Sequence, residues 1–423
     1  MEQRPDSQRV VVTGLGALSP LGLNVNDLWA GLVAGRSGVA PITLFDPEDM
    51  PTRIAGEVKG FDPTKWINFK EARRMGRATQ MAVVAAHEVL ADAGFGSVLP
   101  EDVQEEAGVY IGTAYGPFDK ADEEMQSFAK KGWRGVSPFA LSSPLASMPA
   151  FHVSLMTQAK GPIGTPINAC AAGTQAIVEA SEYIRRGHAQ VMICGGVEGS
   201  VHRYSVAGFC AMRALSTRND EPERASRPFD QLRDGFILSE GAGLVVLESL
   251  EHALARKARI YAEVLGGASS ADAYHVAAPD PKGAGAVRAM KRALRDAGVD
   301  IMAVSYINAH GTSTPINDFT ETMAIKTVFG EQAYNVPISS TKSMLGHAMG
   351  SAGALEAIAC VKTIETGTIH ATINYENPDP ECDLDYVPNT PRQADVRVVL
   401  SNSFGLGGNN ACLVLAKYLN GQH

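Results

Sequence analysis

The feature that most constrains the fold of this chain is a segment that occurs twice. Residues 82–94 align without a gap to residues 286–298, and seven of the thirteen positions are identical. Both copies have the spacing of an amphipathic helix, and a strand-like segment follows each of them, at 109–111 and at 305–307. At 423 residues the chain is too long for one ordinary core. We therefore expect a duplicated unit built from strands and helices.

A second, weaker repeat relates two helix starts. Residues 170–180 line up with residues 347–357 and share alanine, glycine and glutamate positions. This alignment makes Cys170 and His347 equivalent, and packing about a pseudo-twofold axis would bring the thiol and the imidazole together. Chance similarity between two Ala/Gly-rich helices is the competing explanation. The boundary is expected in a helix over 248–260, which divides the chain into an N-terminal half, 1–258, and a C-terminal half, 259–423.

Cys170 lies at the start of a predicted helix. Glycine and proline punctuate residues 161–167, whereas residues 171–186 are helix-forming and are closed by Gly187. The free N–H groups and partial positive charge of a helix N-terminus favour a thiolate, which predicts a nucleophilic sulfur near neutral pH. The alternative is a buried cysteine that serves as a small apolar filler.

Composition excludes several classes of protein. Hydrophobic residues make up 45% and charged residues 20%, which predicts a globular chain without a membrane span. The first nine residues are polar and unlike a signal peptide, and the six scattered cysteines form no CxxC pair, so we expect reduced thiols in the cytoplasm. A formal net charge of -9 argues against nucleic acid as a partner.

Residues 10–13 followed by Gly14 and Gly16 predict a strand and a glycine turn. They do not predict a dinucleotide site, because the third glycine and the acidic ribose partner of that motif are missing.

Three further motifs contain candidate catalytic residues. His310 lies in the loop 308–315, where small and hydroxylated neighbours would form a narrow polar wall. Lys342 precedes His347 by five residues and could anchor the site, although an ordinary solvated lysine is the alternative. The glycine-rich loop 401–410 connects two predicted strands and would allow a ligand close to the backbone. A phosphate cradle is disfavoured because no P-loop lysine or helix accompanies this loop.

Together these motifs resemble the β-ketoacyl-[acyl-carrier-protein] synthases, and most closely the elongating type II enzymes of fatty-acid synthesis. The motif around Cys170, NAHGTSTP at His310, KSMLGHAMGSAGALEA at Lys342 and His347, and SNSFG-x-GG occur in the family's order over nearly the whole chain. The resemblance implies an α/β, thiolase-like fold of two duplicated βαβ halves in a layered α-β-α-β-α arrangement. It also implies a homodimer that needs no cofactor, because its substrates arrive on the phosphopantetheine of acyl carrier protein.

The same resemblance implies a decarboxylative Claisen condensation. Cys170 would take an acyl chain from acyl carrier protein, and the enolate formed from malonyl-carrier protein would attack that thioester. His310 and His347 would stabilise the enolate, and the backbone N–H groups of Cys170 and Leu406 would form an oxyanion hole. The other implied roles are site support by Lys342, Asp318, Glu321, Glu356 and Asn308, a monovalent cation near Asn308, Glu356, Ser401 and Asn402, and substrate contacts by Thr312, Thr314, Phe404, Gly405, Leu406 and Gly407.

Carrier proteins are acidic, so the resemblance also implies a basic docking surface on this acidic chain. The residues at the family's docking positions are Lys70, Arg73, Arg74, Arg77 and Arg213. A solvated helix face is the alternative interpretation. Leu406 stands where most relatives carry a phenylalanine that gates the acyl pocket, which predicts a different gating or chain-length preference.

Three other functions compete with a condensing enzyme of fatty-acid elongation. A polyketide-type ketosynthase would share all of these residues. A non-catalytic chain-length partner subunit would lack the cysteine, so the presence of Cys170, His310 and His347 counts against it. A thiolase would need a second catalytic cysteine near the C-terminus, and Cys412 lies in an apolar strand that suits no acid/base thiol.

Overall fold

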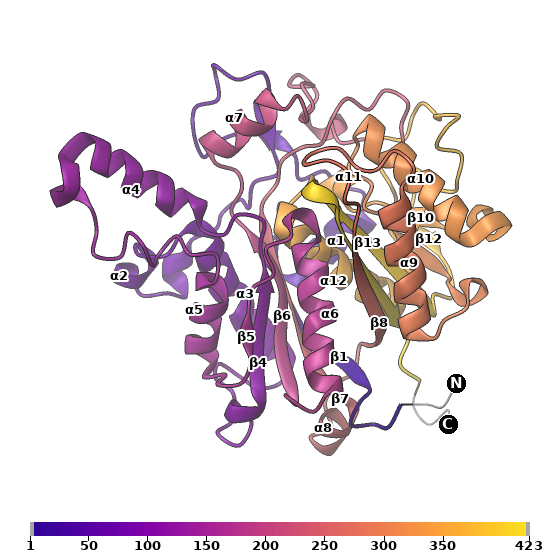
Figure 1. Ribbon diagram of the computed structural model, residues 1–423, viewed down its shortest axis with the longest axis horizontal. Coiled ribbons are helices and arrows are strands. Elements are labelled where there is room, and N and C mark those ends of the chain that lie inside the picture. The colour runs from indigo at the N-terminus through magenta and orange to yellow at the C-terminus, as the bar shows by residue number, and fades with distance from the viewer. Residues whose placement is uncertain (1–3, 420–423) are drawn as a thin grey trace.

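A ten-stranded sheet forms the centre of the computed structural model, which describes residues 4–419 (Figure 1). The first three residues of the polar opening therefore lie outside the described part. The strands stand in the order β10-β9-β13-β14-β8-β1-β7-β6-β4-β5. Their bounds are β1 Val10–Leu18, β4 Ala107–Gly112, β5 Ile163–Gly164, β6 Val191–Glu198, β7 Gly241–Ser249, β8 Ala262–Ala271, β9 Tyr306–Asn308, β10 Ile338–Ser339, β13 Val398–Gly405 and β14 Asn409–Ala416. Two separate strand pairs are β2 Ala40–Pro41 with β3 Ile54–Ala55, and β11 Thr368–Ile369 with β12 Arg392–Gln393.

The sheet consists of two equivalent halves that meet at β1 and β8. In each half three strands are parallel, β5-β4-β6 or β10-β9-β13, and two further strands are antiparallel, β7-β1 or β14-β8. A Cβ on Gly14 of β1 would lie 3.1 Å from the backbone nitrogen of Ala93, and one on Gly266 of β8 would lie 2.5 Å from that of Ala297. Ala93 and Ala297 are themselves equivalent in the repeated segment, so the predicted duplication is confirmed.

Helices cover both faces of the two half-sheets. Helices α6 (Ala172–Arg185) and α12 (Ala352–Thr366) each contact strands of both halves and form the middle layer. Helices α3 (Arg77–Asp92) and α5 (Met148–Thr157) cover the outer face of one half, and α9 (Ala284–Ala297) with α10 (Pro315–Phe329) covers the other (Figure 1). The expected α-β-α-β-α layering is confirmed. The remaining helices are α1 Val25–Val33, α2 Phe69–Ala72, α4 Phe118–Lys131, α7 Arg203–Ala211, α8 Leu250–Ala255 and α11 Lys342–Leu345.

The second repeat is real, but its predicted register is wrong by three residues. Ala169 and Met349 both have left-handed backbone, with φ of 48° and 47°, and each opens a 3-10 turn. The helices that follow begin at residues 172 and 352. The structural counterpart of Cys170 is therefore Gly350, and His347 lies about one helical turn before it. The predicted register has more identical residues than the structural one, because a shift of about one turn superimposes small residues on small residues.

Two local predictions are also corrected. Strand β1 continues through Gly14 and Gly16 to Leu18, so no glycine turn follows residue 13. A Cβ on Gly16 would lie 2.5 Å from the carbonyl oxygen of Ala85, which shows that these glycines serve the close packing of α3 on the strand. The helix expected over 248–260 is only Leu250–Ala255, because β7 extends to Ser249. Within residues 4–419, each helix is too short or too polar to cross a bilayer.

Candidate active site

Three side chains from distant parts of the chain meet in one buried site. Cys170 lies in the 3-10 turn that opens α6, His310 follows β9, and His347 follows α11. The Sγ atom of Cys170 is 2.9 Å from Nε2 of His347, and the two imidazole centroids are 5.3 Å apart. One potential ligand atom from each of the three residues lies within 4.8 Å of the others. The predicted convergence of the thiol and the imidazoles is therefore confirmed.

The ionisation of Cys170 differs from the prediction. Burial raises the pKa of this thiol to about 11. The charge of Lys342 and the backbone N–H groups of Leu406 and Cys170 act in the opposite direction but only in part. The expected resting thiolate is therefore wrong, because desolvation of the anion outweighs the favourable charge and dipoles around it. The sulfur needs a base, and the nearest one is Nε2 of His347.

Both histidines are neutral at physiological pH. Burial lowers the pKa of His310 and of His347 well below the ordinary value, and the charge of Lys342 lowers both further. Nδ1 of His347 has no hydrogen-bond partner among the described residues, so the protein does not fix its tautomer. The ring of Phe236 contacts that of His347 edge-on, with centroids 5.4 Å apart. His347 can therefore accept a proton at Nε2 or donate one from it.

Lys342 is a buried member of the site and not a solvated lysine. Its side chain is 2% exposed, and Nζ pairs with the carboxylate of Glu356. The same Nζ lies 3.3 Å from Nδ1 of His310. Because an ammonium group only donates hydrogen bonds, Nδ1 of His310 must accept, and the ring proton is left on Nε2. The Lys342 ammonium thus determines which atom of His310 can donate into the site.

Two buried acids on the first turns of α10 hold the loop that carries His310. Glu321 accepts from the backbone N–H groups of His310 and Gly311, both at 2.8 Å. Asp318 accepts from Thr312 N at 3.0 Å, and its other oxygen lies 3.6 Å from Nε of Arg233. Burial raises the pKa of Glu321 to about 7 and also raises that of Asp318. The two carboxylates are three residues apart and therefore share one face of α10.

A group of oxygen atoms beside Lys342 fits the expected cation site. Asn308 Oδ1, Glu356 Oε2 and Ser401 Oγ are buried and have no hydrogen-bond partner among residues 4–419. Asn308 and Ser401 are direct neighbours across β9 and β13. Oxygen ligands with a carboxylate among them suit a hard cation. Asn402 does not join them: its side chain points to the opposite face of β13 and donates to Glu321 at 3.2 Å.

Three of the predicted substrate-contact residues, Phe404, Gly405 and Leu406, lie near Cys170 or His310, and the role of the set stays a prediction. Oγ1 of Thr312 and Oγ1 of Thr314 are 2.9 Å apart, and Thr314 also caps α10 by accepting from Asn317 N. The ring of Phe404 lies 5.8 Å from that of His310. In the hairpin loop, a Cβ on Gly405 would lie 3.2 Å from Cys170 N, and Gly407 has φ of 76°. Leu406 packs at the edge of the apolar cluster that contains Cys170.

Four of the five predicted docking residues are exposed, and one is not available for docking. Lys70, Arg73 and Arg74 are exposed on and after α2, and Arg213 is exposed after α7. The guanidinium of Arg77 instead binds the buried carboxylate of Glu240 through Nε at 2.6 Å and Nη2 at 2.5 Å. The prediction that Arg77 belongs to the docking surface is therefore wrong, because a buried carboxylate needs a paired charge.

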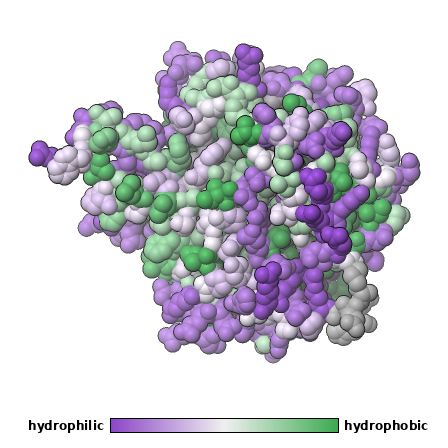
Figure 2. All heavy atoms as spheres, in the orientation of Figure 1, coloured by the Kyte–Doolittle hydropathy of each residue, from purple (hydrophilic) through white to green (hydrophobic). Residues whose placement is uncertain are grey.

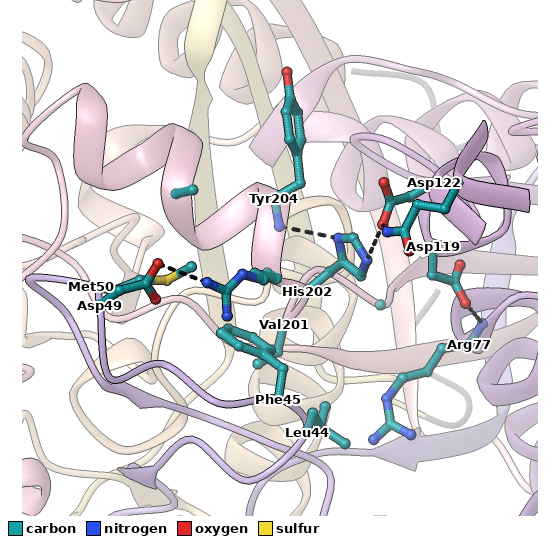
Figure 3. Close-up of a pocket in the computed structure, with 14 residues that line it drawn as sticks. Leu44, Phe45, Asp49, Met50, Arg77, Asp119, Asp122, Val201, His202 and Tyr204 are labelled. Atoms are coloured by element: carbon teal, nitrogen blue, oxygen red, sulfur yellow. Dashed lines mark hydrogen bonds and ion pairs between the residues drawn. The ribbon is translucent and has the colours of Figure 1, made fainter. Parts of the chain in front are cut away.

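Arg77 also borders a cavity of about 600 Å³ between α4, α7 and the loop before β3. Figure 3 shows His202 in this cavity, between the backbone nitrogen of Tyr204 at 3.3 Å and the carboxylate of Asp122 at 3.2 Å. Val201 lines the cavity and also belongs to the apolar cluster around Cys170. The contact between His202 and Asp122 thus joins α4 to the segment whose Val201 shares an apolar cluster with Cys170.

Two residues beside the site, Phe236 and Glu198, carry no predicted role in the sequence. Phe236 contacts the ring of His347, and Glu198 ends β6 with 0% exposure. Nothing in the sequence around Phe236 distinguishes it from other core residues. Glu198 directly follows the apolar run of β6, and this position indicates a buried acid. Such an acid must accept hydrogen bonds from nearby donors to remain buried.

Replacing His347 by alanine should slow alkylation of Cys170 by iodoacetamide about 100-fold near neutral pH. The thiol has a pKa of about 11 and would lose the imidazole that contacts its sulfur. At pH values approaching this pKa the two rates should converge, because hydroxide then ionises the thiol directly. Mass spectrometry of the modified peptides measures both rates, and the half-buried Cys210 is an internal control. Equal Cys170 rates at neutral pH would contradict the assignment of His347 as the base.

Comparisons with known proteins identify the family of this chain. Residues 7–253 match the family model "Beta-ketoacyl synthase, N-terminal domain", and residues 261–376 match "Beta-ketoacyl synthase, C-terminal domain". The chain is 49% identical over 413 residues to a 3-oxoacyl-[acyl-carrier-protein] synthase 2 of Synechocystis, covering 98% of this chain and 99% of that protein. It superimposes with a TM-score of 0.90 on the ishigamide ketosynthase/chain length factor, at 41% identity, covering 97% of this chain and 99% of that one. A type II PKS ketosynthase solved with its acyl carrier protein gives the same TM-score at 35% identity, covering 97% and 99%. The chain is a member of the β-ketoacyl synthase family.

Proposed function

We propose that this protein catalyses the decarboxylative condensation of an enzyme-bound acyl thioester with malonyl-acyl carrier protein, giving 3-oxoacyl-acyl carrier protein in fatty-acid elongation. The observation that carries the proposal is the buried thiol of Cys170 at 2.9 Å from His347, with His310 in the same group of side chains. The 49% identity to a 3-oxoacyl-[acyl-carrier-protein] synthase 2 supports the choice of substrate class.

The first step transfers an acyl chain to Cys170. His347 Nε2 takes the thiol proton as Sγ attacks the acyl carbon of the incoming thioester. The oxyanion of the tetrahedral intermediate accepts hydrogen bonds from the backbone N–H groups of Cys170 and Leu406. In the resting site the same two groups lower the pKa of the Cys170 thiol. As the intermediate collapses, the carrier thiol leaves and takes the proton from His347. The acyl group then remains on the enzyme, and no charge is left in the buried site.

The second step forms the new carbon–carbon bond. His310 donates its Nε2 proton to the thioester oxygen of malonyl-carrier protein, and His347 donates from Nε2 once its tautomer has changed. Carbon dioxide leaves, and the resulting enolate carbon attacks the acyl thioester on Cys170. The tetrahedral intermediate expels the Cys170 thiolate, which takes a proton from solvent. The step needs no redox partner and no cofactor.

The surrounding residues supply binding and support. The hydroxyl groups of Thr312 and Thr314 would hydrogen-bond the phosphopantetheine arm of both substrates. Glu356, Asn308 and Ser401 would hold a monovalent cation through the oxygen atoms that have no hydrogen-bond partner within residues 4–419. Lys342, Asp318 and Glu321 keep His310 and its loop in position, and the rigid scaffold limits reorganisation during the reaction.

Acyl carrier protein is the proposed partner, docked on the exposed Lys70, Arg73 and Arg74 with Arg213. A related ketosynthase has been solved in complex with its own carrier protein.

We also propose a homodimer. Strand β5 is an edge strand, and Ile163 on it is 52% exposed beside Leu155 at 56%. Figure 2 shows apolar residues over this side of the molecule, and sedimentation equilibrium should give twice the chain mass of 44.8 kDa.

Two alternative functions are less well supported. A polyketide-type ketosynthase uses the same residues, but the structures of that class show lower identity, 41% and 35%, than the fatty-acid enzyme. A non-catalytic chain-length partner would not need a thiol in contact with an imidazole. The assembled site of Cys170, His310 and His347 therefore favours a working condensing enzyme.

Cys170→Ala should remain folded, keep malonyl decarboxylation and lose condensation. His310→Ala should still accept the acyl chain on Cys170 but should lose decarboxylation by about 100- to 1,000-fold, because one oxyanion donor is removed. Mass spectrometry of the acylated protein and release of labelled carbon dioxide measure the two steps separately. Condensation by the Cys170→Ala protein would refute the proposed nucleophile.

Potassium or sodium chloride should raise the melting temperature above that in choline chloride at the same ionic strength. A site filled at about ten times its Kd stabilises the folded state by about 1.4 kcal/mol. Ser401→Ala removes one proposed oxygen ligand and should reduce the difference between the salts. Identical melting temperatures of the wild-type protein in all three salts would contradict the cation site.

Charge reversal at Lys70, Arg73 and Arg74 should raise KM for carrier-borne substrates at least about tenfold at low salt and leave turnover of a short pantetheine thioester unchanged. The reason is that docking charges act on encounter and not on the chemical step. Lys291→Glu on α9 changes an exposed charge on the other half of the molecule and is the matched control. Equal KM values for the reversed and control proteins would rule out this docking surface.

A further inference from the structure

Glu198 is a buried acid that the proposed reaction steps do not use. It ends β6 with 0% exposure, and no lysine or arginine pairs with it in the described part of the chain. Its carboxylate instead accepts hydrogen bonds from four groups. These are Ala114 N at 2.5 Å, Gly350 N at 3.1 Å, Thr113 Oγ1 at 3.1 Å and Tyr115 N at 3.3 Å. Thr113 Oγ1 also accepts from Gly116 N at 2.8 Å, so its own hydrogen is directed at Glu198.

These donors come from two turns that border the nucleophile. One turn, residues 113–116, follows β4, and the other is the 3-10 turn Met349–Ser351 that opens α12. The turns touch directly, because a Cβ on Gly350 would lie 2.4 Å from Ala114 N and 2.7 Å from Glu198 Oε2. Gly350 is also the structural counterpart of Cys170 in the other half. Glu198 therefore binds both turns at the point where they pack against the start of α6.

His347 is held by residues outside both turns, whereas the turn that carries Cys170 contacts the second of them. His347 precedes Gly350 by three residues, and its Nδ1 atom has no hydrogen-bond partner within residues 4–419. Catalytic histidines are usually oriented through their second nitrogen, and this one is not. Its ring is instead placed by its backbone, whose N–H donates to Ile237 O at 2.7 Å, and by the edge of Phe236. Ser239 N also donates to His347 O at 3.0 Å, so the backbone of residues 237–239 holds His347. A displacement of the 349–351 turn would instead move the sulfur away from Nε2 through the start of α6, because a Cβ on Gly173 would lie only 2.7 Å from Gly350 O.

We infer that Glu198 is a positioning residue that sets the distance between the Cys170 thiol and the His347 imidazole by tying the 349–351 turn to the 113–116 turn. The inference rests on the proposed function, in which His347 is the base for Cys170. A carboxylate is suited to this role because both of its oxygens only accept hydrogen bonds and can serve donors from two directions. An amide at this position would present its NH₂ group to at least one of the N–H donors.

The test is Glu198→Gln, which keeps the shape of the side chain and changes only its hydrogen bonding. We expect kcat for acyl transfer to fall about 10- to 100-fold with KM for the acyl-carrier substrate unchanged, because a misplacement of about 1 Å between reacting groups has effects of this size. Alkylation of Cys170 by iodoacetamide near neutral pH should slow by a similar factor. The rate at Cys210 in the same protein should not change.

Glu248→Gln is the matched control. Glu248 is also fully buried near the end of a neighbouring strand, but its partners are Arg256, His252 and Thr13, away from the site. It should lower the melting temperature without changing the kcat or the alkylation rate. A folded Glu198→Gln protein with the wild-type kcat and alkylation rate would overturn the inference. Alkylation of Cys170 needs no condensation substrate, so it tests the positioning role separately from the proposed function. If Glu198→Gln slows alkylation but the wild-type protein shows no condensation, the proposed function is wrong and the positioning role stands.

If Glu198→Gln does not fold, Thr113→Val decides. This change removes one donor to Glu198 and keeps the volume and branching of the side chain. The inference predicts a smaller loss of kcat in the same direction, again with KM unchanged. An unaltered kcat and Cys170 alkylation rate in that protein would overturn it.

Discussion

The close packing of the starts of α6 and α12 is the contact on which the rest of the site depends. A Cβ on Gly173 would lie 2.7 Å from the carbonyl oxygen of Gly350, and one on Gly353 would meet the hydroxyl of Thr174 at 2.0 Å. Neither helix could accept a larger residue here without moving away from the other. Cys170 precedes the first of these helices and His347 precedes the second, so the contact between the thiol and the imidazole requires this approach of the two backbones.

Burial governs the chemistry of the site. It raises the pKa of the Cys170 thiol to about 11 and lowers the pKa of both histidines well below the ordinary value. The resting site therefore contains a neutral thiol and two neutral imidazoles, and a proton that passes from the thiol to an imidazole leaves the net charge of the buried site unchanged. The ammonium group of Lys342 is paired with Glu356 and directs the tautomer of His310.

Buried acids beside the site act on backbone turns and not on substrate atoms. Glu321 and Asp318 accept hydrogen bonds from backbone N–H groups of the loop that carries His310. Glu198 accepts hydrogen bonds from backbone N–H groups of the two turns beside Cys170. Each carboxylate replaces lost hydration with fixed donors, which is how an acid can remain buried. The side chains of Cys170, His310 and His347 are thus held through their backbones, which leaves His347 free to change tautomer.

Several features were predictable because they are local or repeated. The amphipathic segment 82–94 and its copy, the small residues around Cys170, and the polar loop at His310 each have a pattern that short-range chemistry explains. The predictions that were wrong concern balances between distant groups. The resting thiolate of Cys170 followed from the helix dipole alone, and Arg77 was assigned to the surface because its partner, Glu240, is 163 residues away. The register of the second repeat was wrong because an Ala/Gly-rich helix resembles itself after about one turn.

The amino-acid sequence by itself determined which residues are available for the chemistry, the duplicated plan of strands and helices, and the membership of the chain in a family of condensing enzymes. Only the tertiary structure decided that the sulfur is protonated at rest, that Glu198 joins the two turns beside it, and that Asn402 faces away from the proposed cation site. The physical reason is that hydration, hydrogen-bond partners and strand faces are properties of the packed interior, and they depend on groups that a linear sequence does not place together.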